Sequence, residues 1–365
     1  MDKPVNHITA RPRRYKFIAL LQVLAILMVV VVHSLHEYPV AHGTATPVHN
    51  ALAMLCNPLF VFASGFLFGW SVLKRGALEP YGPFVRKKLL RIGVPFVVLS
   101  VATFFLRCAM NPYADDVVEP TLSNFALSFV HPDHMALVFL WFVLMLFIMF
   151  NVAYGIVRMC RGRLGAGFFM AAVPLTVTLT LTVGPYSIKW LCIANVLWFM
   201  VYFVLGMAYV RWYDRLNRVL GLRSVWAAVG GVAIWVTCYG LYRHFGASLA
   251  GDELWRIQLF VILPGIYGFT ALAHCLERYG VTFLDHLTEW VFLIYLLSWY
   301  PSTLSQQVLH HFTAWDWWFY TLLSVVTSIY VPVLIGVTLK RAARTRRWAR
   351  AAQLLLGQNH KGDKN

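Results

Sequence analysis

Long apolar runs separated by short polar segments recur along the whole chain. About twenty consecutive apolar residues are enough for a helix to cross the hydrocarbon core of a bilayer. The runs that meet this length, with some polar positions allowed, are residues 17–37, 51–73, 92–110, 136–157, 166–185, 190–210, 224–243, 257–276, 288–309 and 317–339. The pattern therefore predicts an all-α, polytopic integral membrane protein with about ten transmembrane helices.

The first of these spans, FIALLQVLAILMVVVVHSLHEY, is mostly apolar and carries Gln22, His33 and Glu37 along one stripe. Gln22 precedes His33 by eleven residues, close to three helical turns at about 100° per residue, and Glu37 follows His33 by four. The three polar side chains thus share a stripe, with His36 at its edge. An ionisable side chain at membrane depth is costly and indicates a functional site, although a histidine that packs between helices is the alternative interpretation.

Composition and charge narrow the class of protein. Of 365 residues, 59% are hydrophobic and only 13% charged, which excludes a soluble domain of this size. The net charge is +16, but with the N-terminus inside, 27 of the 31 lysines and arginines fall in inner segments. The positive-inside rule explains this bias and predicts that both termini are cytoplasmic. The basic charge thus predicts membrane lipids, and not nucleic acid, as its partner.

The domain organisation is expected to be simple. Residues 1–340 form one membrane domain, and residues 341–365 form a short basic cytoplasmic tail. Six cysteines are scattered without the spacing of metal ligands, so no metal site is predicted.

A dense cationic cluster lies in the inner segment FVRKKLLRIGVPF, residues 84–96. It contains Arg86, Lys87, Lys88 and Arg91, just where the third span begins. Positive-inside topology alone is one explanation of the cluster. The other is that these side chains bind the phosphates of a cytoplasmic anionic ligand.

Two outer stretches carry polar or aromatic candidates. The loop before the fourth span contributes Asp133 and His134, together with His131, but lacks the further ligands that a metal site needs. A late aromatic set includes Trp299 and Tyr300. Such rings are typical of membrane-interface anchors, and a platform on which a sugar stacks is the alternative.

Several stretches together resemble the membrane acyltransferase family 3. They are the first span ending in His33, FVFASGFLFGW (60–70), FVRKKLLRIGVPF (84–96), LWFVLMLF (140–147), FMVYFVLGMAYVRW (199–212) and FLIYLLSWYP (292–301). Each motif is short, but their order, spacing and topology agree with the family over most of the chain. Two positions depart from the family pattern, because Gln22 stands where an arginine is usual and Ser298 where a histidine is usual.

The resemblance implies transfer of an acyl group, most plausibly acetyl, from cytoplasmic acyl-CoA to a hydroxyl of an extracytoplasmic saccharide such as an exopolysaccharide or glucan. On this interpretation the 86–91 cations hold the CoA phosphates, and Gln22 belongs to the donor site. His33 then acts as general base, oriented by Glu37. The alternative mechanism is a relay in which the acyl group is first transferred to His33. His36, Asp133, His134, Trp299 and Tyr300 are the acceptor-side candidates.

Two other functions remain as alternatives. A transporter of a saccharide or lipid-linked saccharide would line a path at mid-membrane with polar groups on several helices. Here the polar residues gather at the two faces instead, which favours the enzyme. A scaffold subunit of a polysaccharide export assembly is the third possibility, because of the departures at Gln22 and Ser298.

Overall fold

The structure is a computed structural model of the chain, and it describes residues 15–36, 45–73, 78–113, 117–162, 164–185, 187–246 and 251–342. Every regular element in these ranges is helical. In chain order the helices are α1 (Lys16–His36), α2 (Thr46–Leu73), α3 (Tyr81–Lys88), α4 (Val94–Met110), α5 (Leu122–Leu127), α6 (Trp141–Met159), α7 (Ala166–Thr182), α8 (Ile193–Arg211), α9 (Tyr213–Val219), α10 (Val225–Gly246), α11 (Gly251–Arg278), α12 (Val291–Leu297), α13 (Trp299–Thr303), α14 (Leu309–Phe312) and α15 (Trp317–Ala342).

The all-α polytopic class is confirmed. Within the described ranges, eight helices are long and apolar enough to cross a membrane, and they cover eight of the predicted spans. The third of them runs unbroken from Tyr81 to Met110, because the π-helical turn η1 (Leu89–Gly93) joins α3 to α4. The predicted span 166–185 corresponds to α7, an apolar helix of 17 residues. The count of ten therefore depends on α7 and on the segment 288–309.

That segment, 288–309, is a series of short helical pieces and not one regular helix. α12 and α13 meet at Ser298, and the π-helical turn η7 (Leu304–Val308) continues α13 into α14. Pro301 has no N–H to donate to the carbonyl of Leu297, and its ring crowds that carbonyl. Ser328 of α15 donates a hydrogen bond of 2.9 Å to the Ser298 carbonyl, so a neighbouring helix binds the backbone at the break.

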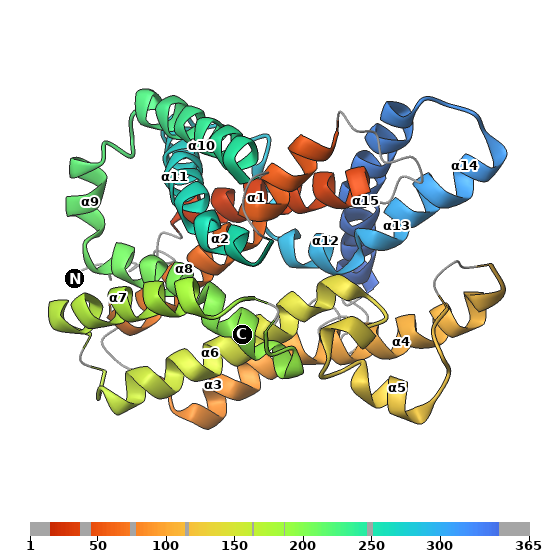
Figure 1. Cartoon of the computed structure of the whole chain (residues 1–365), viewed down its shortest axis with the longest axis horizontal. Helices are drawn as coiled ribbons and strands as arrows, with labels where there is room; N and C mark the ends of the chain where they lie inside the picture. The colour runs from red at the N-terminus through yellow and green to blue at the C-terminus, as the bar shows by residue number, and fades with distance from the viewer. Residues whose placement is uncertain are drawn as a thin grey trace, which may run out of the picture.

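Helix α1 lies at the centre of the bundle. It packs against α2, α11, α12, α13 and α15, and most of its apolar side chains are buried. In Figure 1, α9 lies at the left edge of the molecule, whereas α5 and α14 lie at the right. Following the predicted topology, we call the end with α9 the inner end and the end with α5 and α14 the outer end. α1 thus runs from the inner end at Lys16 to the outer end at His36.

Ion pairs join chain segments that the predicted topology places on the inner side. Lys16 lies 2.8 Å from Asp285, and Lys340 lies 2.6 Å from Glu289. The first pair ties the start of α1 to the turn before α12, and the second ties the end of α15 to the same region. The ends of three helices that are far apart in sequence therefore meet at one end of the bundle.

Glycines allow α2 and α8 to cross in close contact. A Cβ atom on Gly65 would overlap the backbone carbonyl of Phe203, and a Cβ on Gly206 would overlap that of Phe62. Small residues at such crossings let membrane helices approach closely and gain packing energy. Two of the sequence motifs, around Gly65 and around Gly206, therefore face each other. Their role in this structure is to pack the helices that support α1.

Candidate active site

His33 lies in the last turn of α1, at the outer end of the molecule, and its side chain is half-buried. Its ring is 5.6 Å from that of Phe139, centroid to centroid. Phe139 belongs to a short 3₁₀ turn (Val138–Leu140) just before α6. The ring of Phe139 also meets Tyr295 of α12 edge-on at 5.7 Å, and the Tyr295 hydroxyl donates to the Phe139 carbonyl. One side of the imidazole is thus bordered by Phe139, which Tyr295 of α12 holds in place.

A buried polar seam lies directly beside His33. We define it as Ser34, Ser302, Ser305, Gln306 and Ser324, all of which are buried. The hydroxyl of Ser324 on α15 lies 2.8 Å from that of Ser34 and 2.8 Å from that of Ser302. These hydrogen bonds connect α1, α13 and α15 around the turn that carries the histidine.

Gln306 is the most informative member of the polar seam. Its side-chain amide donates to the backbone carbonyl of Ser34, one of the last four carbonyls of α1, which have no acceptor role within the helix itself. The side chain is 0% exposed, and its Oε1 has no hydrogen-bond partner among the described residues. Gln306 therefore fixes the last turn of α1 from the π-helical turn η7.

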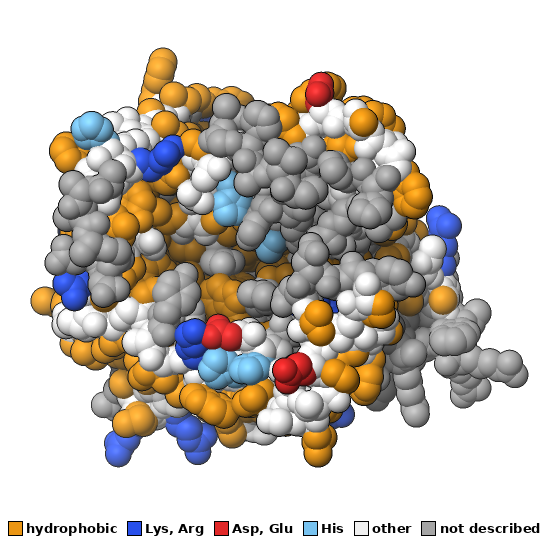
Figure 2. Space-filling view, turned by 45° about the vertical axis from the view of Figure 1, so that its right-hand side comes forward, with side chains coloured by type: hydrophobic (Ala, Val, Ile, Leu, Met, Phe, Trp, Pro, Cys, Tyr) orange, Lys and Arg blue, Asp and Glu red, His pale blue; other side chains and the backbone are white. Residues whose placement is uncertain are grey.

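The outer end of the molecule is hollowed. Figure 2 brings this end forward and shows a depression with a largely hydrophobic floor, with histidine and charged side chains at its border. α1 ends on this side of the bundle, so the half-buried His33 belongs to the same end as the hollow. A polar solute that approaches from this side meets an apolar depression with polar groups around it.

The loop candidates Asp133 and His134 have partners in neighbouring loops. The Asp133 carboxylate pairs with Lys189, and this contact lowers the pKa of the exposed Asp133. Nδ1 of His134 lies 2.9 Å from Oδ1 of Asn124, and the rings of His131 and His134 meet edge-on at 5.1 Å. The structure thus ties these residues into the outer loops.

Trp299 and Tyr300 occupy the first turn of α13 and are half-buried. Their rings contact each other edge-on at 5.4 Å. The Tyr300 hydroxyl is hydrogen-bonded to Thr103 of α4, so this side chain links two helices. Ser298, at the position where the family usually has histidine, is buried and directly precedes Trp299, and its carbonyl accepts the bond from Ser328.

The cations of the 86–91 segment divide into two groups. Arg86, Lys87 and Arg91 are exposed, and Lys87 forms an ion pair with Glu79. Lys88 instead turns inward, and its ammonium lies 3.3 Å from the centroid of the Phe150 ring on α6. A cation over an aromatic face is attracted by the ring quadrupole. Lys88 is the last residue of α3, and Arg91 lies in the π-helical turn η1 that follows. The Lys88 side chain therefore points towards α6, whereas that of Arg91 is exposed.

The remaining candidates are less completely described. Gln22 is half-buried near the middle of α1, three turns before His33. Glu37 and the side chain of His36 lie outside the described residues. Within the described part of the chain, no group of three His, Cys, Asp or Glu side chains is placed to hold a metal ion.

This arrangement supports proton transfer at one end of α1 and anion binding at the inner start of the α3–α4 helix. Imidazole is the side chain whose ordinary pKa lies nearest neutrality, so it can take and return a proton. A family model described as an acyltransferase domain matches residues 15–337, which include both regions. The chain belongs to the membrane acyltransferase family 3. Searches among curated proteins and among solved structures gave no match.

The polar seam was not foreseen from the sequence of this acyltransferase. Ser34 and Ser324 are separated by 290 positions, and Gln306 and Ser34 by 272. Single serines and a glutamine inside apolar spans are common in helix packing, so none of them attracts notice alone. The one residue that could have indicated the polar seam from the sequence is Gln306, because it is a long polar side chain within a predicted span.

Proposed function

We propose that the protein is an integral-membrane O-acyltransferase that moves an acetyl group from cytoplasmic acetyl-CoA to a hydroxyl of an extracytoplasmic saccharide. Family membership supports acyl transfer in general. The donor, the acceptor and the acyl group are what the resemblance to this family implies, and polar groups at both ends of the bundle are compatible with them. We expect the protein to act in the bacterial inner membrane.

The observation that carries the proposal is the position of His33. It is a half-buried imidazole in the last turn of the central helix, bordered by Phe139 and held next to a buried polar seam. A general base must be fixed in place and still accessible to the hydroxyl that it deprotonates. His33 lies in the last turn of α1, at the same end of the bundle as the hollow, and this position supports an acceptor on that side.

On this proposal, a nitrogen of the His33 imidazole removes the proton of the sugar hydroxyl. The hydroxyl oxygen attacks the thioester carbonyl, the carbon–sulfur bond breaks, and the proton passes to the departing CoA thiolate. An acyl-histidine relay would use the same side chain, with the imidazole nitrogen as the first acyl acceptor. Glu37 would orient the imidazole, and Asp133, His134, His36, Trp299 and Tyr300 would line the acceptor side.

The donor would be held at the other end of the bundle. Arg86 and Arg91 are exposed where the α3–α4 helix starts, and guanidinium groups bind phosphate oxygens in a bidentate manner. Lys87 and the inward-turned Lys88 would add positive charge beside them. The pantetheine arm of acetyl-CoA would then extend between helices, past Gln22, towards His33.

Mass spectrometry of surface glycans tests this proposal against transport and scaffolding. Cells that lack the protein are complemented with the wild type, with His33→Ala or with His244→Ala. His244 is a matched control, because it is an exposed histidine at the outer end of α10. We expect His33→Ala to lose one acetyl substituent while the polymer is still exported, and His244→Ala to restore acetylation.

Two outcomes would contradict the proposal. Acetylation that persists in His33→Ala, at normal protein level in the membrane, would remove His33 from the reaction. Loss of the polymer itself, with no change in the acetylation of what remains, would favour transport or scaffolding.

A further inference from the structure

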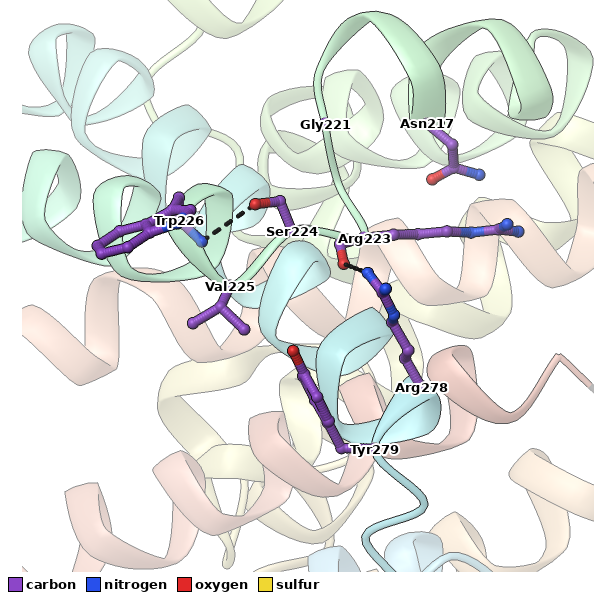
Figure 3. A pocket seen from close by; sticks show the side chains of 8 residues that line it. All are labelled: Asn217, Gly221, Arg223, Ser224, Val225, Trp226, Arg278 and Tyr279. Atoms are coloured by element: carbon purple, nitrogen blue, oxygen red, sulfur yellow. Dashed lines mark hydrogen bonds between the residues drawn. The ribbon is translucent and has the colours of Figure 1, made fainter.

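A cavity of about 390 Å³ opens at the inner end of the bundle and is lined by none of the candidate site residues discussed above. It lies where the segment after α9 turns into α10 beside the end of α11. Figure 3 shows the Arg278 side chain reaching the Arg223 backbone while the Arg223 side chain extends away from it, with Tyr279 beside Arg278 and Trp226 at the left. Arg278 donates a hydrogen bond of 3.1 Å to the Arg223 carbonyl, so the two arginines are held next to each other.

The positive charge of these arginines is not compensated by an ion pair. Among the ion pairs that the described residues form, none includes Arg223 or Arg278. The Arg223 side chain is hydrogen-bonded to the Tyr213 hydroxyl, but burial raises the pKa of Tyr213 in spite of Arg223, so this hydroxyl stays neutral and does not offset the charge of Arg223. Two guanidinium groups that share one cavity repel each other unless an anion joins them.

A buried hydrogen-bond donor also reaches this cavity. Asn217 lines it and is only 8% exposed. Its Oδ1 accepts a hydrogen bond of 2.8 Å from Tyr209, whereas its Nδ2 has no partner among the described residues. A buried N–H group without a partner is costly, and an acceptor oxygen in the cavity would satisfy it.

The border of the cavity is apolar and aromatic. Trp226 is 84% exposed and Tyr279 is 64% exposed. Val225 and Val229 of α10 are also exposed, and they continue from the cavity along the outward face of this membrane-spanning helix. A water-soluble phosphate compound would not need such a border. An amphiphile would, because its phosphate can reach the arginines while its chains lie along α10.

We propose that this cavity binds the phosphodiester headgroup of an anionic phospholipid from the inner leaflet. Arg223 and Arg278 bind the phosphate oxygens, the Asn217 amide donates to one of them, and Trp226 and Tyr279 lie at the level of the headgroup. Basic pockets between helix ends on the cytoplasmic side are suited to such lipids. The site is separate from the 86–91 cluster that we assign to the acyl donor.

Native mass spectrometry of the full-length protein in detergent tests the site, with phosphatidylglycerol and phosphatidylcholine of equal chain length as probes. We expect the wild type to retain phosphatidylglycerol preferentially and to gain thermal stability from it. The double variant Arg223→Gln, Arg278→Gln should bind it about tenfold more weakly. Both arginines are exposed, so the variant should melt like the wild type when no lipid is added.

The control removes two charges from the same end without touching the cavity. Arg215 and Arg218 are exposed on α9 and do not line it. The variant Arg215→Gln, Arg218→Gln should therefore bind phosphatidylglycerol as the wild type does. Equal loss in both double variants would overturn the proposal, because the lipid would then follow overall charge. Displacement of the lipid by an equal concentration of coenzyme A would also overturn it and would indicate a nucleotide site.

Discussion

Two histidines lie at opposite ends of α1, and they differ in almost every respect. At the inner end, His274 of α11 is 3% exposed, and its ring stacks on Phe17 at 3.9 Å. Its Nε2 lies 2.8 Å from the Tyr209 hydroxyl. At the outer end, His33 is half-buried in the last turn of α1. His274 is enclosed and packs helices together, whereas His33 is partly exposed. We therefore expect enclosure, rather than residue type, to separate a packing histidine from one that can take up a proton.

The largest expected effect is the loss of acetyl transfer when His33, at the outer end of α1, is replaced. Replacing His33 by Gln keeps a polar side chain but removes the base. Acetyl transfer should fall by about 10²- to 10⁴-fold, the range typical of general acid–base catalysis. Release of CoA thiol from acetyl-CoA in membrane vesicles measures the rate, and the melting temperature should stay at the wild-type value. A variant that unfolds instead would make His33 a packing residue like His274.

At the inner end, His274→Leu should act on stability and not on chemistry. It removes the hydrogen bond to Tyr209 and the stacking on Phe17, and we expect a loss of about 1–3 kcal/mol in unfolding free energy. Thermal unfolding in detergent measures this loss. The transfer rate per folded molecule should stay within twofold of the wild type; a rate loss comparable to that of His33→Gln would contradict the division between the two ends.

The hydrogen bond from Gln306 to the last turn of α1 is expected to hold His33 in position, and a substitution of Gln306 tests this. Gln306→Leu removes the donor to the Ser34 carbonyl and frees the last turn of α1. We expect the kcat for acetyl transfer to fall about tenfold, because small displacements of a catalytic group are costly, while the KM for acetyl-CoA stays unchanged. Gln258→Leu is the control, since Gln258 is half-buried on α11 and makes only a long contact of 3.4 Å to Tyr242. Equal effects of both substitutions would indicate a general loss of packing.

The smallest effect concerns Asp133. Its pKa is lowered by Lys189, so the ion pair stabilises the fold above the ordinary carboxyl pKa of 3.8 and is lost as the pH falls through the lowered value. Because both side chains are exposed, Asp133→Asn should cost less than about 1 kcal/mol at pH 7. Melting curves at pH 7 and in acid measure the difference, which should disappear in acid. A large loss of glycan acetylation would instead show that acceptor binding depends on the Asp133 carboxylate itself, and not only on the loop that its ion pair holds.

The sequence alone predicted the helical class, most of the spans and the position of His33. These follow from apolar length and from the distribution of positive charge, which are properties of single segments. The motifs around Gly65 and Gly206 were recognised separately, but their contact across α2 and α8 needed the structure. The break at Pro301 was also missed, because the segment 288–309 is apolar enough to look like an ordinary span.

For the candidate site, the sequence indicated single residues but not the contacts that surround them. His33 and the 86–91 cations stand out because polar side chains interrupt apolar sequence. The polar seam depends on contacts between residues nearly three hundred positions apart, as between Ser34 and Ser324, and no local pattern encodes them. The inward turn of Lys88 onto Phe150 likewise depends on how α3 packs against α6.

The π-helical turn η7 has a consequence for insertions and deletions. A π turn is an α-helix with one extra residue, so removing one residue restores the regular helix and rotates everything on one side of it by about 100°. In a regular membrane helix, a single deletion rotates the residues on one side of it by about 100° and so misplaces their packing contacts. Here the loss of Leu304 should leave a sound helix but turn Gln306 away from Ser34. The extra residue of η7 thus sets the rotation of the helical turns around Gln306 relative to α1.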